Sequence, residues 1–252
     1  MEKISDIKDI LKNTSELELY AFIEKYEADS RAGVKTIVKS AKKRLDDYHK
    51  ELERCEKIKF FENKYSDYDY ICGVDEVGRG CLAGPVAAGA VILPKNCDIL
   101  YINDSKKLSP KKREELSKII VKKAVATKVS LVSPEVIDDI NILQATYRAM
   151  NKAISELMVK PDLLLVDAVK IPDNDIKQVA IVKGDSKSIS IGAASIVAKV
   201  YRDSLMDEYD KLFPEYDFKS NKGYGTQKHI DALKLYGPCP IHRKTFIEGI
   251  LK

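Results

Sequence analysis

The 252-residue sequence lacks any apolar run near the roughly 20 residues that a bilayer-spanning helix requires. Its first residues alternate acidic and basic side chains, unlike a secretion signal. It has only 12 glycines and 9 prolines, while charged residues make up 33%, which argues against a fibrous or disordered chain. These absences, with a hydrophobic content of 44%, predict a folded protein without membrane association.

The cysteines do not form a pairing framework. There are five of them, an odd number, and no two are spaced as C-x-x-C. A structural zinc site or a disulfide scaffold needs paired or closely spaced cysteines. We therefore expect reduced thiols and a cytoplasmic location. The cysteines are Cys55, Cys72, Cys81, Cys97 and Cys239.

The net charge of +4 is small but unevenly distributed. The segment 219–252 holds seven Lys and Arg residues against only Asp231 and Glu248. A basic end suggests a polyanionic partner such as a nucleic acid, although a merely solvated surface has the same composition.

Residues 1–66 predict a helical extension without strands. Ser15 and Glu18 have the spacing of a capping box at the start of one helix. Between Val34 and Cys55, apolar residues alternate spacings of four and three, which indicates a seam that packs against another helix. Two uses of this seam are open: a hairpin that closes on itself, or a surface for a protein partner or self-association. The seam residues are Val34, Val38, Ala41, Leu45, Tyr48, Leu52 and Cys55.

Residues 67–252 predict one further domain. The apolar stretches 70–75 and 86–93 indicate two strands, antiparallel because their connection is short. Strands and helices alternate after them. Together these patterns predict an α/β fold, a mixed β-sheet flanked by helices, with the all-helical extension before it. The later strands are expected at 126–132, 163–168 and 178–182, and the helices after Ser109 and Ser133 and over 190–212 and 228–236.

Acidic residues stand at the ends of several predicted strands. Asp75 and Glu76 end the first strand, and burying them without a cation would cost several kcal/mol per charge. A helix cap, or an ion pair from Asp75 to Arg79, would explain the pair structurally. Asp167 and Asp185 follow later strands, so the sheet could bring four carboxylates together. Oxygen-only ligands suit Mg²⁺ or Mn²⁺, and two such ions about 4 Å apart can hydrolyse a phosphodiester.

The backbone at Asp75-Glu76 is expected to be irregular. Adjacent residues of a strand point to opposite faces of a sheet, so both can bind one metal cluster only if the strand turns or bulges there. A straight strand through both residues would count against shared metal binding.

A glycine-rich loop follows these acids. Gly78-Arg79-Gly80 begins a match to the G-x-G-x-x-A dinucleotide fingerprint, but that fingerprint needs a helix next, and here Gly84-Pro85 leads into a strand. We predict instead a loop whose backbone approaches a sugar or phosphate closely, with Arg79 adding charge.

Taken together, the sequence resembles the bacterial ribonuclease HII family. The matching segments span roughly 70–250 in the family's order: GVDEVGRGCLAGPVAAGAVIL, NDSKKLSPKKREEL, LLVDA, KGDSKSISIGAASIVAKVYRD and GYGTQKHIDALKLYGPCPIHRKTF. The resemblance implies an RNase H-like fold and a metal-dependent endoribonuclease that acts on RNA–DNA hybrids and on single ribonucleotides in duplex DNA. It implies products with 3′-hydroxyl and 5′-phosphate ends.

The same resemblance assigns roles to individual residues. Asp75, Glu76, Asp167 and Asp185 correspond to the family's catalytic and metal-binding acids. The loop Gly78-Arg79-Gly80 corresponds to the one that contacts the ribonucleotide 2′-hydroxyl through its backbone. Tyr224 corresponds to the tyrosine that packs on the sugar at the RNA–DNA junction. Sensing one 2′-hydroxyl is what distinguishes RNA from DNA at a single nucleotide. Without the resemblance, Tyr224 would be interpreted as a half-buried aromatic beside a loop.

Other charged residues are secondary candidates. Lys106 and Lys107 are expected at the start of a helix, where they could contact phosphate, as could Lys187 and Lys222. Asp203 rivals Asp185 as the fourth acid, but its mid-helix position favours a pair with a neighbouring base. The related ribonuclease HIII group carries an N-terminal sheet domain, so the strand-free extension here favours type HII.

Two different functions are alternatives. His229 and His242 could form a metal-free acid–base pair that cleaves RNA through its own 2′-hydroxyl, leaving a cyclic phosphate. The basic C-terminal segment could instead belong to a nucleic-acid-binding module. Such a module has no need of four acids, because uncompensated carboxylates repel phosphates.

Overall fold

The computed structural model of the chain describes residues 2–251; Met1, and Lys252 of the basic segment, lie outside the described residues. The chain forms two compact units, one up to Lys57 and the other Ile58–Lys252. None of the helices within residues 2–251 combines the length and apolar character needed to cross a membrane.

The N-terminal unit is all helical, as the sequence predicts. It contains α1 (Ile4–Asn13), the 3₁₀ turn η1 (Glu16–Glu18), α2 (Leu19–Tyr26) and most of α3 (Ala32–Ile58). The predicted capping box is present, with the Ser15 backbone N–H donating to Glu18 Oε2 at 3.0 Å.

The predicted seam of α3 has two different halves. Its first four residues are buried against α1 and α2, so this half closes on the unit's own core. Farther along, Leu52 is 38% exposed. The hairpin alternative is therefore confirmed for the first half, and a partner surface there is wrong. The apolar residues in this core are Ile7, Leu19, Phe22, Ile23, Tyr26, Val34, Ile37, Val38, Ala41 and Leu45.

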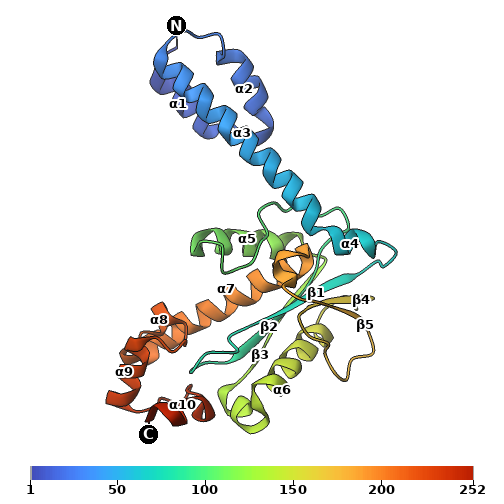
Figure 1. The fold of residues 1–252 in the computed structure, drawn as a ribbon, viewed down its shortest axis with the longest axis vertical. Helices are drawn as coiled ribbons and strands as arrows, with labels where there is room; N and C mark the ends of the chain where they lie inside the picture. Colours follow the sequence, from blue (N-terminus) through green and yellow to red (C-terminus); the bar gives the residue numbers. More distant parts are fainter. Residues whose placement is uncertain (1, 252) are drawn as a thin grey trace. The chain divides into compact units, whose positions relative to one another are not determined.

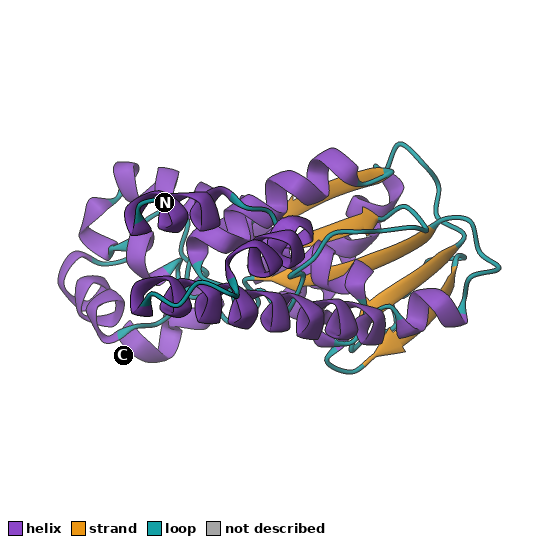
Figure 2. Cartoon of the chain, turned by 90° about the horizontal axis from the view of Figure 1, so that it is seen from above, coloured by secondary structure: helices purple, strands orange, loops and turns teal. Residues whose placement is uncertain are grey.

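The second unit is built on the predicted mixed sheet, with strand order β3-β2-β1-β4-β5. Strands β1 and β2 are antiparallel neighbours, whereas β4 and β5 run parallel to β1. Figure 2 shows the strands of this unit side by side in one sheet. The strands are β1 (Ile71–Val77), β2 (Val86–Ile92), β3 (Ala126–Val132), β4 (Leu163–Asp167) and β5 (Lys177–Ile181). The fold class predicted from the sequence is confirmed.

Helices cover both faces of the sheet (Figure 1). On one face, α6 (Pro134–Ser155) packs on apolar side chains such as Cys72 and Val74. On the other face lie α5 (Pro110–Lys123) and α7 (Ile189–Leu212). Gly73 explains how closely α7 approaches, because a Cβ there would lie 2.0 Å from the carbonyl carbon of Ser190. The short helix α4 (Phe60–Lys64) precedes the sheet.

The chain ends in a small helical cluster beside the end of α7 (Figure 1). It contains η3 (Pro214–Tyr216), α8 (Phe218–Asn221), α9 (Gln227–Tyr236) and α10 (Lys244–Leu251). Its buried residues Phe218, Leu233 and Ile247 pack in one cluster with Met206 of α7 and with Ala83 from the β1–β2 connection. The glycine-rich loop after β1 is thereby tied to the C-terminal segment. Of the four C-terminal elements, only α9 is predicted from the sequence.

Candidate active site

The four predicted acids line one cavity of about 310 Å³ at the carboxyl ends of the parallel strands. Asp75 and Glu76 come from the end of β1 and Asp167 from the end of β4. Asp185 lies in the 3₁₀ turn η2 (Gly184–Ser186) after β5. Parallel neighbours end at the same edge of a sheet, which is where α/β folds collect functional groups. The predicted loop Gly78-Arg79-Gly80, Lys106 and Tyr224 line the same cavity.

The predicted bulge at Asp75-Glu76 is wrong. Strand β1 pairs regularly with β2 through both residues, with Asp75 opposite Gly89 and Glu76 opposite Ala88. The two side chains therefore start on opposite faces of the sheet. On the other side of β1, the pairing with β4 already ends at Val74. Because no strand covers that side of the last residues of β1, both carboxylates reach the same cavity without a backbone irregularity.

Asp75 is a buried carboxylate, 6% exposed, on the face of the sheet that α7 covers. Burial raises the pKa of Asp75 well above its usual range, and the negative charges of Glu76 and Asp167 raise it further. Hydrogen bonds from the Ser195 side chain and from the Glu76 backbone N–H, at 2.7 Å, oppose this shift. No Lys or Arg within residues 2–251 forms an ion pair with Asp75, so its charge is uncompensated.

Glu76 and Asp185 are also partly buried, and the pKa of each is raised. Burial raises the pKa of Glu76, although its ion pair with Arg79, at 3.1 Å, acts against the shift. This is not the ion pair from Asp75 to Arg79 that the structural alternative required. Burial also raises the pKa of Asp185, and the nearby Asp104 and Asp167 charges add to it. The Asp167 carboxylate accepts the backbone N–H of Gly184 at 2.6 Å.

These carboxylates suit hard cations, but they do not form a closed metal cage. Within residues 2–251, no three His, Cys, Asp or Glu side chains are grouped closely enough to hold an ion together. Mg²⁺ is commonly bound by only one or two protein carboxylates, with water and substrate phosphate completing its shell. The donor set therefore fits such an ion, whereas a four-ligand structural metal site is excluded for the described residues.

The glycine-rich loop is held from behind by a buried arginine that the sequence analysis missed. Arg243 is fully buried and donates from Nη2 to the Gly78 carbonyl at 2.6 Å and from Nη1 to the Arg79 carbonyl at 2.8 Å. Its Nε donates to the Gly84 carbonyl at 3.0 Å. Arg202, also fully buried, binds the carbonyls of Ala83 and Pro85 in the same connection. Neither contact leaves a spacing pattern in the sequence.

Tyr224 is partly exposed (39%) and borders the cavity. Its carbonyl accepts a hydrogen bond from His229 Nδ1 at 2.9 Å. The Lys199 ammonium lies 5.9 Å from the centre of the Tyr224 ring. An exposed face and a fixed backbone are what a ring that contacts substrate needs, and they also fit a half-buried aromatic beside a loop.

The remaining predicted lysines differ in their surroundings. Lys106 and Lys107 lie in a turn before α5, so their predicted position at the helix start is wrong, because the helix begins only after the Ser109 cap. Lys107 and Lys187 are exposed and lie outside the cavity lining. Lys222 forms an ion pair with Asp207 and does not line the cavity, so its contact with phosphate stays a prediction.

Asp203 does not line the cavity. It accepts ion pairs from Lys199 at 2.7 Å and from Arg113 at 3.3 Å, as predicted for its mid-helix position. Its spacing from Ser195 and Lys199 along α7 places the three on one helical face. Ser195 and Lys199, which the sequence analysis missed, both line the cavity, and this spacing of four was the available signal. Asp104, beside Asp185, was also missed.

The two histidines do not support the metal-free alternative. His229 and His242 are buried, 0% and 3% exposed, and neither lines the cavity. An acid–base pair has to reach its substrate, so this alternative is wrong.

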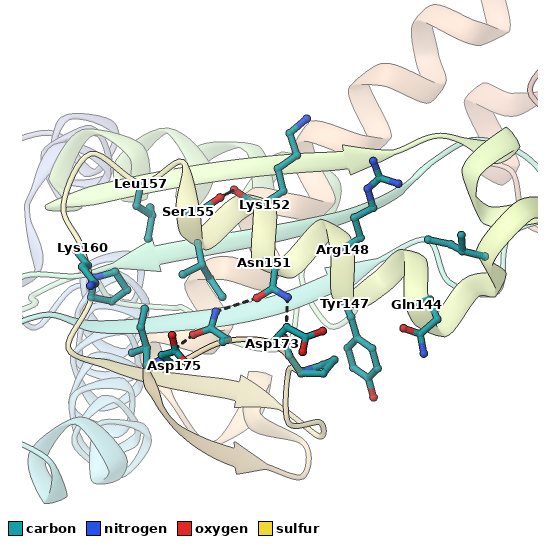
Figure 3. A pocket seen from close by; sticks show the side chains of 16 residues that line it. Gln144, Tyr147, Arg148, Asn151, Lys152, Ser155, Leu157, Lys160, Asp173 and Asp175 are labelled. Atoms are coloured by element: carbon teal, nitrogen blue, oxygen red, sulfur yellow. Dashed lines mark hydrogen bonds between the residues drawn. The ribbon is translucent and has the colours of Figure 1, made fainter.

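A larger cavity, about 1080 Å³, lies elsewhere, between α6 and the segment before β5 (Figure 3). Asn151 donates to the Pro172 carbonyl at 3.0 Å and accepts from Asn174 at 2.9 Å, so its central polar groups are already paired. None of the predicted site residues lines it.

Comparison with known proteins gives a consistent result. The family model "Ribonuclease HII" matches residues 72–248, and "Ribonuclease HII N-terminal domain" matches residues 3–66. The chain is 55% identical to a ribonuclease HII of Lachnoclostridium phytofermentans over 98% of each chain. It is 52% identical to that of Clostridioides difficile over 99% of each chain. The crystal structure of ribonuclease H2 from Pyrococcus horikoshii OT3 matches with a TM-score of 0.61 and 27% identity, covering 72% of this chain and 97% of that one.

Proposed function

Because the chain belongs to the ribonuclease HII family, we propose that it cuts RNA in RNA–DNA hybrids and at ribonucleotides embedded in duplex DNA. The resemblance stated from the sequence is confirmed, and the chain is a nuclease rather than a binding module. We propose two-metal-ion hydrolysis that leaves 3′-hydroxyl and 5′-phosphate ends, with Mg²⁺ or Mn²⁺ as the ions.

The observation that carries the proposal is the uncompensated negative charge of the cavity. Within the described residues, Asp75, Asp167 and Asp185 line it without an ion pair to Lys or Arg, and burial raises the pKa of two of them. Carboxylates in this condition are stabilised by a bound cation. A divalent ion supplies an activated water and stabilises the leaving oxygen of a phosphodiester.

The protein residues have separate tasks in this proposal. Asp75, Glu76, Asp167 and Asp185 would hold the ions. Ser195 would help to orient the Asp75 carboxylate, and its hydroxyl is itself hydrogen-bonded to that of Ser105 at 3.0 Å. Lys106 brings positive charge to the cavity wall, where it favours a bound phosphate, whereas the charge of Lys199 is shared with Asp203.

Selection of RNA depends on the other wall of the cavity. The loop Gly78-Arg79-Gly80 presents backbone, since two of its residues lack side chains, and a backbone can hydrogen-bond a 2′-hydroxyl. Tyr224 lies at the same cavity and would pack on the neighbouring sugar. The substrate partners are therefore a hybrid or a ribonucleotide-containing duplex.

The proposal is tested with an RNA–DNA hybrid of defined sequence, with Mg²⁺ or Mn²⁺ and with EDTA. We expect cleavage only with metal, and products that a ligase can rejoin after annealing because they carry 5′-phosphate and 3′-hydroxyl ends. Cleavage that persists in EDTA, or 2′,3′-cyclic phosphate ends, would contradict two-metal hydrolysis.

A further inference from the structure

The environment of Arg243 is unusual for an arginine. Its side chain is 0% exposed, and no carboxylate within residues 2–251 forms an ion pair with it. All three of its hydrogen bonds go to backbone carbonyls, those of Gly78, Arg79 and Gly84. Burial lowers the pKa of Arg243 to about 10. A buried charge without a counterion is costly, and a purely packing role would be filled better by an apolar residue.

Two of these carbonyls belong to successive peptide units. The Gly78 carbonyl shares its plane with the N–H of Arg79, and the Arg79 carbonyl shares its plane with the N–H of Gly80. In a trans peptide the carbonyl and the N–H point in opposite directions, and the described residues contain no cis peptide bond. Holding both carbonyls on one guanidinium therefore directs both N–H groups away from Arg243.

Neither N–H is used by another group within the described part of the chain. Among residues 2–251, the backbone N–H groups of Arg79, Gly80 and Cys81 donate no hydrogen bond, whereas those of Leu82, Ala83 and Gly84 all do. Of these three residues, Arg79 and Gly80 line the cavity of the acids, whereas Cys81 does not. Two consecutive N–H groups held in this way can both donate hydrogen bonds to one oxygen atom of a ligand.

We propose that Arg243 is a positioning residue that fixes these two peptide planes and thereby sets the preference for a ribonucleotide over a deoxyribonucleotide. This inference rests on the proposed function and deepens it. Arg243 itself lies behind the loop and contacts no substrate. Its fork can hold two carbonyls at once, which the single ammonium of a lysine cannot do in the same geometry.

The test compares the wild-type chain with the Arg243→Lys variant, both with Mg²⁺. The substrate is a DNA duplex with one ribonucleotide, and the same duplex without it serves as a competitive inhibitor. We expect KM for the substrate to rise about tenfold in the variant, while kcat and the inhibition constant of the all-DNA duplex change by about twofold or less. The ratio of the two constants measures ribose discrimination, and an unchanged ratio would overturn the proposal.

Leu233→Ala is the matched control for lost stability. Leu233 is fully buried in the same C-terminal core but contacts none of the loop carbonyls. We expect this variant to lower Tm and to leave the discrimination ratio unchanged. If Leu233→Ala lost as much discrimination as Arg243→Lys, the effect of Arg243 would come from protein stability alone. That result would contradict the proposal.

A second measurement applies if Arg243→Lys does not fold. Amide hydrogen exchange of the wild-type chain, in EDTA to prevent turnover, is compared between the two duplexes. We expect the amides of Arg79 and Gly80 to gain protection with the ribonucleotide duplex only; equal protection by both duplexes would overturn the proposal. If the wild-type chain does not cleave the ribonucleotide duplex with Mg²⁺, the proposed function itself fails, which is a distinct outcome.

Discussion

The imidazole rings of His229 and His242 meet through their Nε2 atoms, 2.9 Å apart, in the buried core of the C-terminal helices. His229 Nδ1 donates to the Tyr224 carbonyl, so its Nε2 is free to accept from His242. The Cys239 backbone N–H donates to His242 Nδ1 at 3.0 Å. When both rings are neutral, every ring nitrogen has a hydrogen-bond partner. A proton added to either ring would turn an accepting nitrogen into a donor and remove one of these hydrogen bonds.

The first prediction concerns acid stability. Burial and the neighbouring His229 lower the pKa of His242 to about 4, whereas an unfolded histidine titrates at its ordinary value of 6.5. Between these values the unfolded chain binds the additional proton, so the free energy of unfolding falls as pH falls from 6.5 towards 4. The contribution from His242 is about 3 kcal/mol.

Urea denaturation at pH 7 and at pH 4.5 measures this effect. In His242→Gln the chain should be less stable at pH 7 but lose less stability on acidification than the wild type. His49→Gln is the control, because His49 forms an exposed contact with Tyr20 in the N-terminal unit. An acid loss in His242→Gln as large as in the wild type would contradict the neutral pair.

The second prediction concerns Asp75→Asn. Because the folded pKa of Asp75 is raised, its stabilising contribution is present at acid pH and is lost as pH rises through the folded value. At neutral pH the charge therefore destabilises the metal-free chain. We expect the variant to raise Tm in EDTA by a few degrees, given about 2–4 °C per kcal/mol for a domain of this size.

The same variant should reduce kcat at least about 10³-fold while hybrid affinity falls little or rises, because a charge that repels phosphate is removed. Asp98→Asn is the control, since Asp98 is exposed and ion-paired to Lys123 at 2.7 Å. Wild-type turnover in Asp75→Asn would show that the site is assigned wrongly.

The third prediction concerns the glycine that begins the loop Gly78-Arg79-Gly80. Gly78 has a φ of +88°, and a Cβ there would lie 2.2 Å from Nε of Arg202. We expect Gly78→Ala to cost about 1–3 kcal/mol of stability and to lower kcat/KM at least about tenfold. Gly249→Ala, where a Cβ meets no atom within 4 Å, should retain wild-type activity and Tm or exceed that Tm. Equal behaviour of the two variants in thermal melts and kinetics would contradict the role of the Gly78 conformation.

The fourth prediction concerns the Tyr224 ring. If the ring packs on a sugar, Tyr224→Phe should be nearly neutral, whereas Tyr224→Ala should raise KM for a single-ribonucleotide duplex about tenfold. Tyr236→Ala serves as the control, because Tyr236 is 60% exposed and does not line the cavity. Steady-state kinetics in which Tyr224→Ala keeps the wild-type KM would leave Tyr224 as a structural aromatic.

Features set by neighbouring residues were predicted from the sequence, whereas features set by contacts between distant segments were not. Strand β3 was predicted over 126–132 and occupies Ala126–Val132, because alternation, caps and strand-end acids are local signals. The straight course of β1 was not predicted, because it depends on regular pairing with β2 through Asp75 and Glu76, and the access of both acids to the cavity depends on where the pairing with β4 ends. Arg243 was assigned only to a basic segment. Its partners are backbone carbonyls of the Gly78–Gly84 region, which any residue type could supply.

The most direct measurement of the central claim uses a DNA duplex with one ribonucleotide, labelled at its 5′ end, with Mg²⁺ and with EDTA, mapping the cut at nucleotide resolution. Metal-dependent hydrolysis on the 5′ side of the ribonucleotide is the result that we predict. Cutting that is independent of the ribonucleotide, or that continues in EDTA, would contradict the claim that the acids around Asp75 form a metal-dependent, ribose-selective active site.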